Sequence, residues 1–372
     1  MKKIILVILL SISLFSKESL YLNIPTDLPH KDTVTSFGKE LIKLINNSKT
    51  SISFAIYGLR GQDEVLNALI DAKNRGVTIK GVADSDSHNK NYYTDTKLLY
   101  KYFDIKSDHQ SYIMHNKFFI IDKKIIWTGS SNVSDTGTGG YNANNAIIIK
   151  NKQVASIYLD EFYQMFNDKL FHIHKENHTT QNIKTEDSTI SIYFSPKSNT
   201  YKCAIKNLIQ NAQTYIYIPI FYLTHKDLAK ELLKAKNRGV DIKIILDATA
   251  ARNKYSMHRL LRKQGIKVKV ENFGGKMHCK SIIIDDKYFV TGSMNLTKAG
   301  NSKNDENTLV IKNSTLTKQY KKYFLTLWNQ IPNKFLYLDP NPESLDSGNS
   351  CFDGIDNDFD HTIDSKDKMC KR

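Results

Sequence analysis

The chain has 372 residues, 40% of them hydrophobic, and carries a formal net charge of +15 at pH 7. This length exceeds that of the usual single domain, and the apolar share is enough for ordinary cores, which excludes a chain too polar to fold. The charge favours an anionic partner: nucleic acid, an acidic membrane surface or a phosphorylated substrate. Only seven of the 53 basic residues are arginine and the lysines are scattered, so compositional bias is the alternative explanation.

The first 19 residues are typical of an export signal. Lys2 and Lys3 precede an apolar stretch, Ile4 to Phe15, that is too short to span a bilayer. We therefore expect an exported protein, periplasmic or secreted. No small-residue cleavage site follows, so an uncleaved membrane anchor stays an alternative, as does a buried N-terminal strand or helix.

The remainder of the chain contains a duplication. Residues Ala72 to Val77 recur 163 residues later as Ala235 to Val240. The same spacing matches further residues of the two copies: Asp84 with Asp247, His115 with His278, Lys117 with Lys280, Asp122 with Asp285, and Gly129 with Gly292. Because so many separated matches do not arise by chance, the sequence predicts two tandem copies of one domain.

Each copy alternates helical and β-rich segments in the same order. The predicted elements of the first and second copy are a helix (37–47; 201–212), a strand (51–57; 215–222), a helix ending at a glycine (Gly76; Gly239), a buried strand (77–84; 240–247), a strand with a His-x-Lys segment (113–121; 276–284) and a closing helix (153–167; 316–329). This alternation predicts an α/β fold, with two tandem α/β/α domains at residues 20–171 and 190–338. The polar segment 172–189 lacks periodicity and is predicted to be a linker.

The two strongest candidate sites begin at His115 and His278. On a strand, residues i and i+2 share a face, so each segment presents an imidazole together with the ammonium of Lys117 or Lys280. A lone histidine on an apolar strand is usually a core residue, but two identical segments favour function. Each segment is followed by a Gly-Ser-x-Asn turn, and these turns supply Ser130, Asn132, Ser293 and Asn295. Imidazole, ammonium, hydroxyl and amide groups around one point suit a phosphate.

With these motifs the chain resembles the phospholipase D superfamily, whose signature is His-x-Lys-x4-Asp followed by Gly-Ser-x-Asn. The resemblance covers residues 34–330. It implies that the two copies pack about a pseudo-twofold axis and pool their motifs into one active site that needs no metal or other cofactor for catalysis. One histidine attacks phosphorus and forms a phosphohistidine, while the other protonates the leaving alcohol and then activates water. It further implies an anionic phosphodiester substrate, and a monomer without an obligate protein partner, since one chain holds both half-sites.

The resemblance also implies roles for individual residues. His115 is expected to be the nucleophile and His278 the general acid, and the phosphate oxygens are expected to be held by Lys117, Lys280, Asn132 and Asn295. A structural or supporting role is expected for Asp122, Asp285, Ser130 and Ser293. Glu306 stands where the family uses a carboxylate to orient a catalytic histidine, whereas the first copy has Asn144 at the aligned position. Only one histidine is then expected to gain a carboxylate partner, so the two halves are not equivalent.

The substrate stays open between two classes. Hydrolysis of phospholipid headgroups is the preferred hypothesis, and a metal-independent endonuclease acting on DNA or RNA is the alternative. A nuclease needs a basic groove with stacking aromatic residues. Two segments are candidate walls for it: Lys90, Tyr92, Tyr93, Lys97, Tyr100, Lys101 and Tyr102, and Arg252, Lys254, Arg259, Arg262 and Lys263. The same residues also fit solvated helix faces, and the tyrosines fit a membrane interface. A phosphate-binding module without activity is disfavoured, because both His-x-Lys pairs are intact.

Residues 339–372 form an acidic tail. Cys351 and Cys370 bracket its acidic segment and are the expected disulfide, which leaves Cys203 and Cys279 as expected buried thiols. The alternating acidic residues resemble a calcium loop. The expected ligands are Asp356, Asp358, Asp360, Thr362, Asp364 and Asp367. His361 replaces the usual glycine and an aspartate closes the loop, so a disordered acidic terminus is the alternative. Any calcium is expected to be structural and far from the catalysis.

Overall fold

Each copy of the duplicated sequence forms one mixed β-sheet. The computed structural model describes residues 17–90, 93–108 and 112–371. In spatial order, the strands of the first sheet are β1 (Lys17–Asn23), β9 (Asn144–Lys150), β7 (Ile125–Gly129), β6 (Phe118–Ile121), β2 (Ser51–Ile56), β4 (Thr78–Ala83) and β5 (Asp104–Ser107). Those of the second are β10 (Thr180–Lys184), β11 (Thr189–Ser195), β17 (Glu306–Lys312), β16 (Tyr288–Gly292), β15 (Ile282–Ile284), β12 (Tyr215–Ile220), β13 (Asp241–Leu246) and β14 (Lys267–Val270). Apart from β10, the two orders are equivalent, which confirms the predicted duplication.

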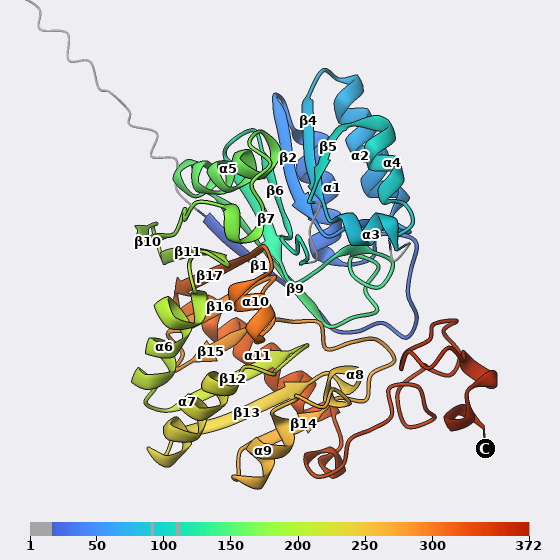
Figure 1. Cartoon of the computed structure of the whole chain (residues 1–372), viewed down its shortest axis with the longest axis vertical. Helices are drawn as coiled ribbons and strands as arrows, with labels where there is room; N and C mark the ends of the chain where they lie inside the picture. Colours follow the sequence, from blue (N-terminus) through green and yellow to red (C-terminus); the bar gives the residue numbers. More distant parts are fainter. Residues whose placement is uncertain (1–16, 91–92, 109–111, 372) are drawn as a thin grey trace, which may run out of the picture.

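Helices cover both faces of each sheet, as the alternation of the sequence predicted. The first repeat contains α1 (Ser36–Asn47), α2 (Asp63–Asn74), α3 (Ser85–Asn89), α4 (Thr96–Tyr102) and α5 (Lys152–Phe166). The second contains α6 (Lys206–Asn211), α7 (Lys226–Asn237), α8 (Ala248–Ala251), α9 (His258–Lys263), α10 (Lys298–Ser302) and α11 (Ser314–Gln330). A short ladder, β3 (Leu59–Arg60) with β8 (Val133–Ser134), lies outside both sheets. Figure 1 shows the two repeats one above the other, with the red C-terminal tail beyond α8.

The inner faces of the two repeats share one hydrophobic core. Apolar residues of α5 and α11 pack in the same cluster as residues from strands of both sheets. Separate cores lie under α1 and α2 in the first repeat and under α6 and α7 in the second. Because the shared core joins the repeats, their motif-bearing ends are held in a constant relation to each other.

The ends of the first repeat differ from the prediction. Residues 1–16 of the predicted signal lie outside the described residues. Residues 17–19 belong to β1 and pair with Lys150, Ile149 and Ile148 of β9, so the domain begins at least three residues earlier than predicted. The predicted linker contains β10, which pairs with β11 at the edge of the second sheet, and a short helical turn at His172–His174, of which His172 is buried. Among the described residues, no helix is both long and apolar enough to span a membrane.

The predicted strands that carry the His-x-Lys segments are shorter than expected. Regular pairing begins at Phe118 in β6 and at Ile282 in β15, so both His-x-Lys pairs lie ahead of the sheets. The backbone there pairs with the opposite repeat: Met114 bridges Asp305, and Met277 bridges Ala143. The backbone at each histidine therefore bonds across the repeat interface, whereas Lys280 still bridges Ile220 of β12 in its own repeat.

Asp122 and Asp285 lie at the far ends of β6 and β15 and have positive φ angles of 51° and 54°. Each carboxylate accepts backbone N–H groups from the loop that precedes a central strand. The donors are Lys49, Thr50 and Ser51 for Asp122, and Gln213, Thr214 and Tyr215 for Asp285. Burial raises the pKa of both groups, but these hydrogen bonds outweigh it and lower both pKa values overall. Both aspartates therefore stabilise a loop and do not contact the motif histidines.

We therefore predict that Asp122→Ala destabilises the protein without impairing its chemistry. The substitution leaves three backbone N–H groups without their acceptor, which should lower the free energy of unfolding by about 1–3 kcal/mol. Urea unfolding measures the loss, and turnover is measured at a temperature where the variant is folded. Asp285→Ala serves as the matched variant, and a large fall in kcat with unchanged stability in either variant would contradict this structural role.

Candidate active site

His115 lies in a site to which both repeats contribute. Its Nδ1 is 2.8 Å from Oε2 of Glu306, at the start of β17 in the other repeat. Glu306 is fully buried and also accepts a hydrogen bond of 2.6 Å from the hydroxyl of Ser293. Burial raises the pKa of Glu306 to about 8, although Lys117 and the Ser293 hydroxyl oppose the shift. The carboxylate partner expected for one histidine is therefore found on His115, and it comes from the opposite repeat.

His278 has an equivalent position with a neutral partner. Its Nδ1 is 3.1 Å from Oδ1 of Asn144, at the start of β9. The hydroxyl of Ser130 donates to the same amide oxygen over 2.9 Å. This contact confirms the predicted alignment of Asn144 with Glu306. Because an amide oxygen can only accept, it fixes the hydrogen of the His278 ring on Nδ1 and leaves Nε2 with its lone pair.

The site concentrates positive charge in a buried place. Burial and the charges of Lys117 and Lys280 lower the pKa of both histidines well below the usual value. Burial also lowers the pKa of Lys117 to about 7, with Glu306 and Asp84 opposing it, and burial and the charge of Lys117 lower the pKa of Lys280 well below its usual value. Cations so poorly solvated favour an anionic ligand, since an anion between them compensates their mutual repulsion.

Backbone contacts fix the two histidine segments. The carboxylate of Asp84 accepts the N–H of Met114 at 2.7 Å, and that of Asp247 accepts the N–H of Met277 at 3.1 Å. The sequence marked these aspartates only as repeated positions, and the structure places each one behind a motif histidine. Gly292 is required in its turn, because a Cβ atom there would lie 2.1 Å from the carbonyl oxygen of Asn307.

Asn132 and Asn295 are each anchored by a hydrogen bond within their own repeat. The amide of Asn132 is 2.6 Å from the hydroxyl of Tyr93, and its other terminal atom is buried without a hydrogen-bond partner among the described residues. Because the nitrogen and oxygen of an amide are assigned from the hydrogen-bond network, the free atom can equally be the N–H donor that a phosphate oxygen needs. The side chain of Asn295 accepts the backbone N–H of Tyr222 at 3.3 Å, which leaves its amide nitrogen as a donor.

Aromatic rings form the walls next to the histidines. Tyr57 packs edge-on against His115 with ring centroids 5.8 Å apart, and Phe221 lies 5.2 Å from His278. The ammonium groups of Lys117 and Lys280 lie 5.9 and 5.0 Å from the centres of the same two rings. Apolar walls of this kind exclude water and strengthen the electrostatic interactions inside the site.

The second predicted wall of a nucleic-acid groove is occupied by acidic partners. Arg252 pairs with Asp358, while Arg259 and Arg262 pair with Asp339 over 3.4 and 2.6 Å. In the first wall, Tyr93 contacts Asn132, and Tyr92 lies outside the described residues. The arginines of the second segment are thus engaged within the protein, which weakens the case for a continuous basic groove.

The acidic tail is ordered around a cluster of carboxylates. Cys351 and Cys370 form the predicted disulfide, with Cα atoms 5.5 Å apart. Cys279 is buried as expected, but Cys203 is exposed, since the helical turn that carries it lies at the surface.

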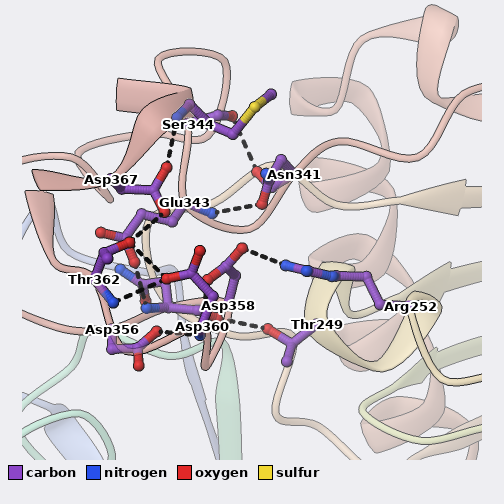
Figure 2. Close-up of polar contacts among 12 residues, drawn as sticks. Thr249, Arg252, Asn341, Glu343, Ser344, Asp356, Asp358, Asp360, Thr362 and Asp367 are labelled. Atoms are coloured by element: carbon purple, nitrogen blue, oxygen red, sulfur yellow. Dashed lines mark hydrogen bonds and ion pairs between the residues drawn. The ribbon is translucent and has the colours of Figure 1, made fainter. Parts of the chain in front are cut away.

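Two overlapping sets of side chains in the tail have the spacing of metal ligands: Asp356, Asp358 and Asp360, and Glu343, Asp358 and Asp367. Figure 2 shows these carboxylates converging from both sides of the loop. Glu343 was missed by the sequence analysis, because it precedes the loop and only folding brings it there. It accepts the backbone N–H groups of Asn357 and Asp364.

Two of the expected calcium ligands are used differently. The carboxylate of Asp364 accepts the backbone N–H groups of Asp353 and Gly354, and this loop contact accounts for its oxygens. The hydroxyl of Thr362 donates to Asp360 at 2.6 Å and also lies 3.1 Å from Asp367 (Figure 2). The spacing of acidic residues in the loop thus predicted a cluster of carboxylates, but which residues belong to the cluster depends on the fold.

The tail also contacts residues close in sequence to the catalytic segments. The carbonyl oxygen of Asn357 accepts hydrogen bonds from Lys276 at 2.6 Å and from Thr249 at 3.0 Å. Lys276 precedes His278 by two residues. The hydroxyl of Tyr141, three residues before Asn144, donates to Asp353. The tail therefore contacts residues that precede His278 and Asn144 in the chain.

Comparisons with known proteins agree with this arrangement. The family model described as "Cardiolipin synthase, PLD-like domain" matches residues 41–166 and again residues 205–328. A phospholipase D of Rickettsia bellii (strain RML369-C) is 34% identical over 139 residues, which are 37% of this chain and 69% of the relative. The human mitochondrial cardiolipin hydrolase is 28% identical over 130 residues, 35% of this chain and 52% of that protein.

A solved structure extends the agreement to the whole fold. Phosphatidylserine synthase of Haemophilus influenzae Rd KW20 superposes with a TM-score of 0.63 over 84% of this chain and 86% of its own, at 14% identity. The identity is too low to carry more than the fold. Two family matches in tandem, each with a complete His-x-Lys motif, show that the chain belongs to the phospholipase D superfamily and is a phosphodiesterase of that type.

Proposed function

We propose that this protein hydrolyses phospholipid headgroups through a covalent phosphohistidine. The observation that carries the proposal is the exchange of partners, in which Nδ1 of each motif histidine is held by a residue of the other repeat. In this proposal, Nε2 of each ring then acts at one phosphorus atom. Lys117, Lys280, Asn132 and Asn295 bind the non-bridging oxygens of the phosphodiester in this proposal.

His115 is proposed as the nucleophile. When Nε2 of His115 forms a bond to phosphorus, the ring gains positive charge, and the carboxylate of Glu306 at Nδ1 stabilises that charge. The bond from phosphorus to the leaving alcohol breaks as the new bond forms. A neutral partner such as Asn144 gives His278 no such stabilisation.

His278 is proposed as the general acid and base. Its protonated Nε2 gives its proton to the oxygen of the leaving alcohol. An imidazolium without a carboxylate partner releases its proton more readily, so the ring beside Asn144 suits this role. A bound phosphate anion opposes the lysine charges that lower the pKa of His278, so substrate binding favours the protonated ring. In the second step Nε2 takes a proton from water, the water oxygen attacks phosphorus, and the bond to His115 breaks.

Phospholipid is preferred as the substrate, with nucleic acid as the alternative. The relatives carry the names phospholipase D and cardiolipin hydrolase, and the arginines of one candidate groove wall are paired with carboxylates. The disulfide of the tail supports an exported protein, because such bonds persist in oxidising compartments. Since both half-sites lie in one chain, we also propose that the protein acts as a monomer.

The first test offers the purified protein mixed phospholipid vesicles and, in parallel, single-stranded DNA and RNA, all in EDTA. We predict headgroup release with intact nucleic acid. Strand cleavage with intact lipid would instead support the alternative nuclease, and complete inhibition by EDTA would contradict a mechanism that relies on two histidines.

The same assay tests the catalytic pair. His115→Asn and His278→Asn should each reduce kcat by at least about 100-fold, because each removes a group that transfers protons or bonds to phosphorus. A phosphohistidine trapped in rapid-quench samples should disappear in His115→Asn. Substantial residual turnover in both variants would exclude a shared site.

The pH dependence follows from two buried groups, Lys117 and Glu306. Lys117 is protonated below its pKa of about 7 and neutral above it, so its attraction for the phosphodiester is lost as the pH rises through this value. We predict that kcat/KM passes through a maximum between pH 7 and pH 8, because Glu306 becomes the charged partner of His115 as the pH rises through its pKa of about 8, while Lys117 loses its charge. A profile of kcat/KM against pH measures this, and a flat profile up to pH 9 would contradict it.

Calcium in the tail stays a prediction that can be tested directly. If Glu343, Asp358 and Asp367 bind Ca²⁺, 1 mM CaCl₂ should raise Tm by a few degrees relative to EDTA, because a ligand that binds only the folded state stabilises it. Asp358→Asn should abolish the shift, and Asp346→Asn, at an exposed position of the same tail, should retain it. An unchanged Tm in the wild-type protein would exclude a site of useful affinity.

A further inference from the structure

The predicted linker inserts a histidine between carboxylates of both repeats. His172 is fully buried. Its Nε2 lies 3.3 Å from Oδ2 of Asp108 in the first repeat, and its Nδ1 lies 3.0 Å from Oδ2 of Asp305 in the second. The backbone N–H of His172 donates to the other oxygen of Asp305 at 2.8 Å. The ring nitrogens are not aligned for strong hydrogen bonds with either carboxylate, so the contacts act mainly as ion pairs.

This arrangement requires a charged ring. A neutral imidazole has one N–H and one lone pair, and the lone pair would then face a carboxylate. Burial disfavours the charge on His172, but Asp108 and Asp305 outweigh it and raise the pKa of the ring to about 9. At neutral pH the segment therefore places an imidazolium between the two repeats.

Lys175 supplies a second buried cation to the same carboxylate. Its Nζ lies 2.8 Å from Oδ1 of Asp305, and it also pairs with Glu161 of α5 and donates to the carbonyl oxygen of Ser195. Asp305 is thus held by two cations that lie three residues apart in one segment. Together the cations satisfy buried carboxylates that would otherwise be strongly destabilising.

Asp305 is connected directly to the nucleophile proposed above. Its carbonyl oxygen accepts the backbone N–H of His115 at 2.8 Å, and its own N–H donates to Ile113 at 3.1 Å. The next residue in the chain is Glu306, whose carboxylate contacts Nδ1 of His115. A shift of Asp305 therefore moves both the backbone and the side-chain partner of His115.

Among the described residues, the other half of the site has no carboxylate in the position of Asp305, although Asp247 and Glu271 are buried near Lys276 there. Ala143 occupies the position of Asp305, and its carbonyl oxygen accepts the N–H of His278 at 3.0 Å. The backbone pairing of a motif histidine therefore does not need a carboxylate at this position. The cations of the linker occur only on the side where the histidine has Glu306 as its partner.

We propose that His172 is a positioning residue for His115, acting as a buried imidazolium that holds Asp305 and thereby keeps Glu306 at Nδ1 of His115 during phosphoryl transfer. The inference rests on the proposed function, in which His115 forms the bond to phosphorus. It assigns the linker a part in positioning the catalytic residues through Asp305.

The test compares His172→Gln with His174→Gln, two residues further along the same turn, where the side chain is exposed. Bis(4-nitrophenyl) phosphate is the probe, because it reports phosphodiester cleavage whatever the natural leaving group is. We expect His172→Gln to lower kcat by about 100-fold, as misplaced catalytic groups do, with KM within twofold of wild type. His174→Gln should match the wild-type protein in both constants.

Two outcomes separate this inference from the function on which it rests. If the wild-type protein cleaves no phosphodiester, the proposed function fails and the inference with it. If the wild-type protein is active and His172→Gln retains its kcat, or raises only KM, the inference alone is overturned.

A measurement on the wild-type protein covers the case in which His172→Gln does not fold. Nitrogen NMR of protein labelled with [15N]histidine distinguishes an imidazolium from either neutral tautomer. At pH 7.5 we expect the resonances of His172 to be those of a doubly protonated ring, and a neutral ring would overturn the proposal.

Discussion

The site depends on two backbone hydrogen bonds that cross between the repeats, from His115 to Asp305 and from His278 to Ala143. Each histidine makes this bond outside the regular pairing of its own sheet, and Glu306 or Asn144 follows the accepting residue directly in the chain. Because the backbone of one repeat thus positions the histidine of the other, neither repeat forms a complete half-site alone. The shared core under α5 and α11 then has a specific consequence: it fixes the distance over which these bonds form.

The second constraint is the burial of charge. The site holds Lys117, Lys280 and Glu306 away from water, and each has a displaced pKa because burial penalises its charged form. Such groups cost stability when they are not compensated. In this site the same burial favours ligand binding. A phosphate anion placed between two poorly solvated ammonium groups interacts with them more strongly than it would in water.

The sequence was sufficient to predict the duplication, the two α/β sheets, the motif histidines, their lysines and the disulfide, because each leaves a local or strictly repeated pattern. It also predicted the non-equivalence of Glu306 and Asn144. It failed where partners are distant in the chain. Glu343 joins the acidic cluster of the tail only through folding. His172 lies in a polar segment without periodicity, and only the fold shows that it pairs with Asp108 and Asp305. The predicted strand at 276–284 was too long, because regular pairing begins only at Ile282. An extended segment has the same sequence pattern whether it pairs within its own sheet or with the other repeat.

Duplication alone would produce two identical half-sites. The difference between them comes from substitutions within the repeats, such as Glu306 against Asn144, and from contacts made by residues outside the repeats. Two parts of the chain have no counterpart, the linker after α5 and the tail, and each contacts one histidine segment. The linker bonds to Asp305 beside His115. The tail bonds to Lys276 ahead of His278 and to Tyr141 ahead of Asn144. In a reaction where one histidine attacks phosphorus and the other transfers protons, unequal support is an advantage, because the nucleophile needs a charged partner that the acid does not.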